Sequence, residues 1–73
     1  MGGLMTLSAR NQFKGTIDEV QIGDVLAQVT VRVGDSVIDS VITRRSAEEL
    51  GLRKGDSVTA VVKATEVMIS KEN

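Results

Sequence analysis

Three short parts of the sequence offer hydrogen-bond donors with few acceptors beside them. Residues 8–11 read Ser-Ala-Arg-Asn, residues 43–46 read Thr-Arg-Arg-Ser, and Lys63 ends an apolar run. A guanidinium presents a planar fork of donors that matches the oxygens of an oxyanion, and an ammonium adds a compact positive charge. Hydroxyl groups can turn their protons toward the same ligand. Together these groups suit a tetrahedral dianion, and they include no catalytic base.

Each of these parts also has a structural interpretation that needs no ligand. Arg10 can lie on a solvated edge strand, Ser46 can cap a helix, and Lys63 can extend along a sheet edge to reach water. Arg44 and Arg45 are expected to be solvated rather than to contact a ligand. The residues alone therefore leave both interpretations open.

The composition argues against several classes of function. The chain has no Cys and no His, so it lacks disulfides, the common zinc ligands and the usual nucleophile–base pairs. Phe13 is the single aromatic residue and the net charge is −1, so neither base stacking nor a general nucleic-acid surface is expected. No apolar run suits a membrane span and no secretory signal opens the chain. We expect a cytoplasmic protein that is not an enzyme and has no nucleic-acid or membrane partner.

Strands are expected to position the donors. Residues 25–33 alternate apolar and polar side chains, and residues 36–43 follow a Gly34-Asp35 pair, which predicts a hairpin with a primed turn. Residues 8–20, 57–63 and 66–70 also look extended. About five strands in an all-β chain favour a small five-stranded OB-like barrel, although an SH3-like barrel fits the pattern too.

One short helix is expected between the third and fourth strands. Ser46 is followed by Glu49 and then by Gly51, which is the pattern of a capping box with a glycine stop. Such a helix would begin near Ser46 and run for one to two turns. Its free N–H groups would then lie beside the hydroxyls of Thr43 and Ser46.

The size of the chain predicts an oligomer. Its 73 residues allow one domain with a thin core. Domains this small usually need disulfides, a metal ion or association with other subunits. Without Cys or His, association is the remaining means of stabilisation.

The donor-bearing parts resemble motifs of the molbindins, which are Mop-type molybdate-binding proteins with a TOBE domain. Residues 8–15 are similar to the opening signature of that family, residues 46–52 with Gly55 to its helix and following turn, and residues 61–69 to its closing strands. The resemblance implies an OB-related domain over residues 6–70, preceded by a leader at 1–5 and followed by a tail at 71–73.

The resemblance also implies what is bound and where. Molybdate, or tungstate as its mimic, would be held as an oxyanion between subunits, with no protein atom ligating the metal directly and no catalytic cofactor. The homo-oligomer would be a hexamer, built as a trimer of dimers, that serves molybdenum storage and homeostasis. The positions that match ligating residues are Ser8, Ala9 through its backbone, Arg10, Thr43, Ser46 and Lys63. Thr43 and Ser46 would come from the neighbouring subunit.

Two alternatives stay open. The same module occurs as an accessory domain of molybdate-transport ATPases and of molybdate-responsive regulators. Residues 52–58 also resemble a turn and strand of the swapped-hairpin transcription factors of the AbrB type, which bind DNA as dimers. The net charge of −1 and the opening motif count against DNA binding.

Overall fold

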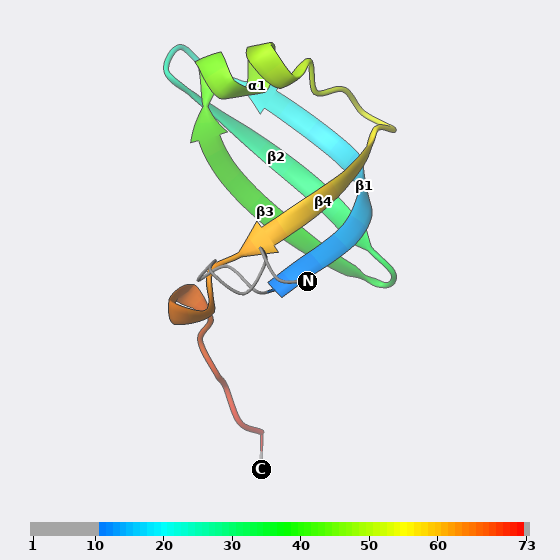
Figure 1. Ribbon diagram of the computed structural model, residues 1–73, viewed down its shortest axis with the longest axis vertical. Coiled ribbons are helices and arrows are strands. Elements are labelled where there is room, and N and C mark those ends of the chain that lie inside the picture. Colours follow the sequence, from blue (N-terminus) through cyan, green and yellow to red (C-terminus); the bar gives the residue numbers. More distant parts are fainter. Residues whose placement is uncertain (1–10, 73) are drawn as a thin grey trace, which may run out of the picture.

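The computed structural model describes residues 11–72, which form a single antiparallel sheet and one short α-helix (Figure 1). The elements are β1 (Asn11–Ile22), β2 (Leu26–Val33), β3 (Ser36–Thr43), α1 (Arg44–Leu50), β4 (Ser57–Val62) and the 3-10 turn η2 (Ala64–Glu66). The order of strands in the sheet is β3-β2-β1-β4. The predicted β fold with a helix between the third and fourth strands is therefore confirmed.

β1 pairs with two different strands along its length. Its second half pairs with β2 and its first half with β4, and the change occurs at Thr16. The neighbouring Gly15 explains how the strand can turn. A Cβ atom at Gly15 would overlap the carbonyl oxygen of Arg32, and it would lie 2.9 Å from side-chain atoms of Val31 and Val33. Because only glycine permits this backbone approach, β1 can leave β2 and curl toward β4.

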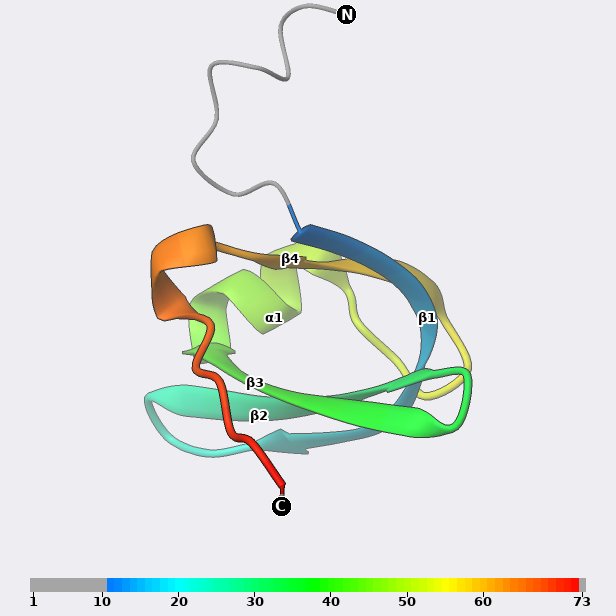
Figure 2. The same cartoon turned by 90° about the horizontal axis from the view of Figure 1, so that it is seen from below.

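The curled sheet has its core on the concave side (Figure 2). Ile17, Val29 and Val31 form the buried cluster, and Val33, Val58 and other half-buried side chains pack against it. The predicted alternation is confirmed over the β2 residues, since the odd positions point inward. The buried apolar residues of the described chain number five, with Ala27 and Ala47 completing the set. The core is as thin as the chain length predicts.

Gly-Asp pairs lie in the turns before three of the strands, at residues 23–24, 34–35 and 55–56, and the hairpin predicted at Gly34-Asp35 is confirmed. Gly34 has a φ of 59° and Asp35 has no positive φ, which fits a hairpin turn of type II′. At the third pair, Asp56 accepts a hydrogen bond from the backbone N–H of Arg53 at 2.9 Å. Two backbone bonds join this turn to Ile17, whose N–H donates to Asp56 and whose carbonyl accepts from Gly55. The turn therefore fixes the start of β4 against the bend of β1.

The fifth strand predicted at residues 66–70 does not form. β4 ends at Val62, η2 follows, and residues 67–72 leave the sheet with no strand assigned to them (Figure 1). Met68 is 92% exposed and Ile69 is 88% exposed. Extended residues need a neighbouring strand to satisfy their N–H and C=O groups, and residues 67–72 pair with none of the four described strands. Residues 11–72 therefore make an open sheet rather than a closed barrel.

The helix begins at Arg44, two residues before the predicted start. Thr43 is its N-cap, because the Thr43 Oγ1 atom accepts from the Ser46 backbone N–H at 3.0 Å. The predicted capping box at Ser46 is wrong, since the hydroxyl that ends β3 already fills the capping role. Gly51 ends the helix in the left-handed region with a φ of 63°, as predicted. No helix among residues 11–72 is long and apolar enough to cross a membrane.

The capping geometry predicts unequal effects of removing the two hydroxyls. Thr43→Ala should lower the free energy of unfolding by about 1 kcal/mol, the usual cost of losing an N-cap. Ser46→Ala should cost clearly less, because Ser46 contributes its backbone N–H to the cap. Urea unfolding followed by far-ultraviolet circular dichroism, without oxyanion and at one protein concentration, measures both. Thr43→Ser is the control that keeps the cap, and equal losses for the two alanine variants would contradict this assignment.

Candidate oxyanion-binding site

The predicted donors fall into two groups in the structure, and Lys63 belongs to the first. It follows directly after β4, and its side chain is exposed. The adjacent Val62 pairs with Asn11, the first described residue of β1. Ser8, Ala9 and Arg10 lie outside the described residues, but they directly precede Asn11 in the chain. Lys63 and the attachment point of the opening motif are therefore neighbours. We call Lys63 with residues 8–10 the strand half.

Lys63 directly follows β4 and continues its exposed alternate positions, as the alternation predicts. Val58, Ala60 and Val62 are half-buried, whereas Thr59 and Val61 are exposed. The ion pairs found among residues 11–72 are Arg32–Asp18, Arg44–Glu48 and Arg45–Glu49. Within that part of the chain, the Lys63 ammonium has no carboxylate partner and can meet an anionic ligand.

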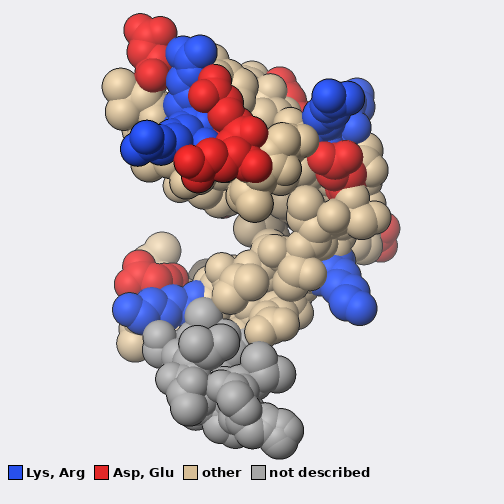
Figure 3. Space-filling model, turned by 45° about the horizontal axis from the view of Figure 1, so that its top comes forward, with Lys and Arg blue, Asp and Glu red and all other residues tan. Residues whose placement is uncertain are grey.

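Thr43 and Ser46 form the second group at the start of α1, which we call the helix half. Their hydroxyl oxygens are 2.8 Å apart. The intervening arginines are exposed and bind carboxylates of their own helix: Arg44 Nε lies 2.8 Å from Glu48, and Arg45 Nε lies 3.8 Å from Glu49. Basic and acidic side chains accordingly alternate over this end of the molecule in Figure 3. Both arginines are solvated, as predicted. The Thr43 hydroxyl donates to Ser46 Oγ, so among the described residues of the helix half it is the Ser46 hydroxyl that keeps a proton for a ligand.

Lys63, at the end of β4, and the helix half, at the start of α1, lie at opposite ends of the sheet (Figure 1). Thr43 pairs with Leu26, which is next to the Ile22 end of β1, whereas Lys63 follows the partner of Asn11 at the other end. At about 3.3 Å per residue, the path along β1 between these ends is on the order of 35 Å. The bend of β1 shortens this distance through space. Among the described residues, Lys63 and the helix half of one chain are therefore at separate ends of the sheet.

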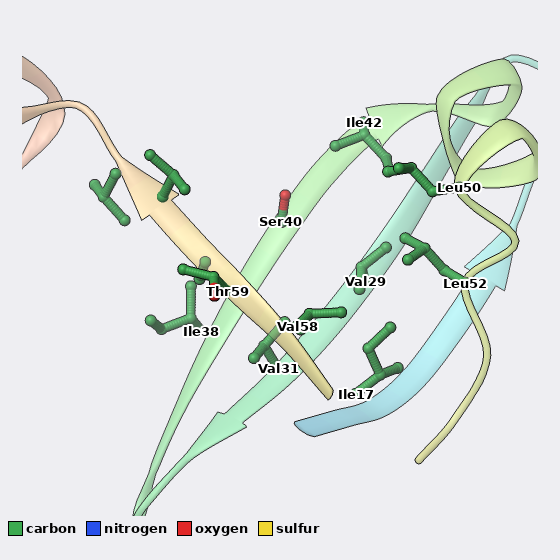
Figure 4. A pocket seen from close by; sticks show the side chains of 13 residues that line it. Ile17, Val29, Val31, Ile38, Ser40, Ile42, Leu50, Leu52, Val58 and Thr59 are labelled. Carbon is green, nitrogen blue, oxygen red and sulfur yellow. The ribbon is translucent and has the colours of Figure 1, made fainter. Parts of the chain in front are cut away.

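An apolar groove of about 410 Å³ opens between β3 and β4, and it is a poor candidate for binding an anion (Figure 4). Among the described residues that line it, Ser40 and Thr59 have polar side chains and none is a cation. It is lined by Ile17, Val29, Val31, Ile38, Ser40, Ile42, Leu50, Leu52, Val58, Thr59, Ala60, Val61 and Val62. The groove lies on the concave face of the sheet, and residues 11–72 supply no strand between β3 and β4 to cover it.

Asn11 is a polar residue to which the sequence alone assigned no role. Its side-chain Nδ2 donates to the carbonyl oxygen of Val62 at 3.2 Å. The two residues are 51 positions apart, so only the β1–β4 register could have revealed this contact. No group of three or more His, Cys, Asp or Glu side chains suited to a metal ion occurs in the described part of the chain.

Comparison with known proteins extends these observations. The TOBE domain family matches residues 7–69. Molybdenum-pterin-binding protein 2 of Clostridium pasteurianum is 47% identical over 66 residues, which cover 89% of this chain and 97% of that protein. A molybdate-binding protein from Sporomusa ovata has a similar structure, with a TM-score of 0.84 and 37% identity over 89% of this chain and 97% of that one.

A third relative is larger. The cytoplasmic molybdate-binding protein ModG, solved with molybdate bound, matches with a TM-score of 0.74 and 42% identity over 80% of this chain and 42% of that chain. All three relatives are named for binding and none for a reaction. Residues 52–58, which also resemble AbrB-type proteins, here form the connection from α1 into β4. The chain belongs to the TOBE domain family and, within it, to the Mop-type or molbindin branch.

Proposed function

We propose that this protein binds molybdate or tungstate as an intact oxyanion between subunits and stores it in the cytoplasm. The names of the relatives support the ligand, and the description of ModG as cytoplasmic supports the location. The observation that carries the proposal is the register of β1 against β4, because it says which side chains would share one face at the end of the sheet.

The register pairs Asn11 with Val62 and Gln12 with Val61. Continued by one residue, it would set Arg10 opposite Lys63, on the outward face that Gln12 and Val61 share. Two cations directly opposite each other in a sheet repel, so the arrangement is favourable only with an anion between them. Ser8 is two residues from Arg10 and would share that face. The strand half would then hold a guanidinium, an ammonium, a hydroxyl and the nearby backbone of Ala9.

The helix half of a second subunit would complete the site. Thr43 and Ser46 lie at the other end of the sheet from Lys63. The Thr43 hydroxyl donates to Ser46 Oγ, and the Ser46 hydroxyl keeps a proton that can be donated to a ligand of the same kind. In a twofold dimer each subunit would give its strand half to one site and its helix half to the other. The completed site would contain donors and no catalytic base, so it would bind the oxyanion without transforming it.

Association would also close the barrel. β3 and β4 present free edges on either side of the apolar groove, whereas Val67, Met68 and Ile69 expose apolar side chains on a tail that leaves its own sheet (Figure 1). Unpaired edges accept an added strand, whose backbone satisfies the free N–H and C=O groups. Residues 66–70 of a second copy would then form the fifth strand of the OB-like barrel. Three such dimers would give the hexamer that the molbindin family implies.

Assembly is tested first. Light scattering at micromolar concentration should show a hexamer for the wild-type protein. Ile69→Asp should give smaller species and lose molybdate binding, because burying Ile69 contributes about 1.5–3 kcal/mol per subunit. Lys71→Asp introduces the same carboxylate on the same tail outside residues 66–70, and it should remain assembled. A folded wild-type monomer would contradict both the closed barrel and the shared site.

The division of the site between subunits can be tested by complementation. Lys63→Ala breaks the strand half and Ser46→Ala breaks the helix half, so each variant alone should bind molybdate at least about tenfold more weakly. Unfolding and refolding an equimolar mixture should restore wild-type affinity at about a quarter of the sites, those with both halves intact. Isothermal titration calorimetry measures affinity and stoichiometry together, and a mixture that is not refolded is the control. If refolding restores no tight sites, both halves act within one chain.

The donor-rich site also predicts selectivity. Near neutral pH molybdate is an unprotonated dianion, whereas phosphate keeps a proton that would face donors only. Such an unpaired contact costs roughly 1–3 kcal/mol, which is about 5- to 150-fold in affinity. Sulfate has no proton but is smaller, so a rigid ring of donors cannot close onto it. Competition titrations at fixed ionic strength should rank tungstate beside molybdate, with both far above sulfate and phosphate. Displacement of molybdate by phosphate at a comparable concentration would reveal a general anion patch.

A further inference from the structure

We propose that Asn11 is a positioning residue for Lys63, an inference that rests on the proposed oxyanion site. Among residues 11–72, the Asn11 side chain donates to the Val62 carbonyl rather than contacting the Lys63 ammonium. It acts instead on the peptide from which the Lys63 side chain departs, at the point where β4 gives way to η2.

Asn11 is a polar residue on the concave side of β1. The residues that follow it at alternate positions are Phe13, Gly15 and Ile17, and none of them offers a polar side chain. Its half-buried amide uses its Nδ2 donor on the Val62 carbonyl oxygen at 3.2 Å. A polar group in such a place costs free energy unless it is hydrogen-bonded, so this contact accounts for its orientation.

The hydrogen bond from Asn11 to the Val62 carbonyl also constrains the backbone of Lys63. The Val62 carbonyl and the Lys63 N–H belong to one planar peptide, so holding the carbonyl also sets the direction of that N–H and the position of the Lys63 Cα. Lys63 needs such a constraint because it lies between the last residue of β4 and the first of η2, with an extended φ of −67° and ψ of 133°. Freed of the contact, this junction could rotate and carry the ammonium away from the outward face.

The same contact joins the start of β1 to the end of β4. The side chain of Asn11, the first described residue of β1, holds the carbonyl of Val62, the residue that directly precedes Lys63. This hydrogen bond adds to the backbone register of the two strands at the point where β4 ends.

The first measurement is the affinity of an Asn11→Leu variant for molybdate. Leucine keeps a similar volume on the half-buried concave face but donates no hydrogen bond, so the assembled fold should persist by light scattering and circular dichroism. Affinity should fall about 3- to 10-fold, as expected for one lost hydrogen bond. Thr30→Val is the matched control, because it removes one side-chain hydrogen bond, from Thr30 to Asp39, in the middle of the sheet. Its affinity should be unchanged.

A double-mutant cycle separates positioning from a general structural role. Asn11→Leu should cause no further loss in a Lys63→Ala background, because the group that it positions is gone. In a Ser46→Ala background it should cause the same fold-loss as in the wild-type protein, because the helix half is independent. An equal loss in both backgrounds, or no loss in the wild-type protein, would overturn the inference. If Lys63→Ala itself bound molybdate normally, the proposed site would fall, and the inference with it.

Discussion

The close approach of β1 to β2 at Gly15 determines the form of the sheet. A side chain at that position would meet the Arg32 carbonyl, so the strand could not leave β2 and continue along β4. The bend gives the sheet its concave side, where Ile17, Val29 and Val31 are buried. It also separates β4 from β3, and the groove between their edges follows directly. The bend at Gly15 therefore has two effects. It creates the concave side that holds the core, and it leaves the apolar groove on that side uncovered.

The parts of the fold that the sequence predicted are those specified by neighbouring residues. The alternation in β2, the Gly34-Asp35 hairpin and the Gly51 stop each depend on a few adjacent positions and one backbone preference. The start of the helix was predicted two residues late because Thr43 and Ser46 are both good N-cap residues. Thr43 takes this role because β3 ends there. Residues 66–70 have the composition of a strand, but composition does not supply a partner strand.

The candidate site was predictable to a different extent. Lys63 and the Thr43–Ser46 pair could be selected because their residue types suit an oxyanion, and the family resemblance chose among the possible donors. Their placement at opposite ends of the sheet could not be read from the sequence, because it depends on the strand order β3-β2-β1-β4. The Asn11 contact was hidden for the same reason. Residue chemistry suggested the ligand, whereas the topology separates Lys63 from the Thr43–Ser46 pair and so supports the proposal of a site shared between subunits.

The uncovered groove and the separation of Lys63 from the helix half have a common physical consequence for the proposed assembly. In the proposed oligomer, association would cover the apolar groove and stabilise a chain with a thin core, and a ligand that needs both the strand half and the helix half would bind only the associated form. The free energy of ligand binding would then contribute to the stability of the assembly, because a ligand that binds one state and not another stabilises the state that it binds. In the proposed oligomer, oxyanion bound between subunits would oppose their dissociation, and a loaded assembly would be more stable than an empty one. Stability and storage would accordingly depend on the same interface, which the curled sheet leaves each chain unable to complete alone.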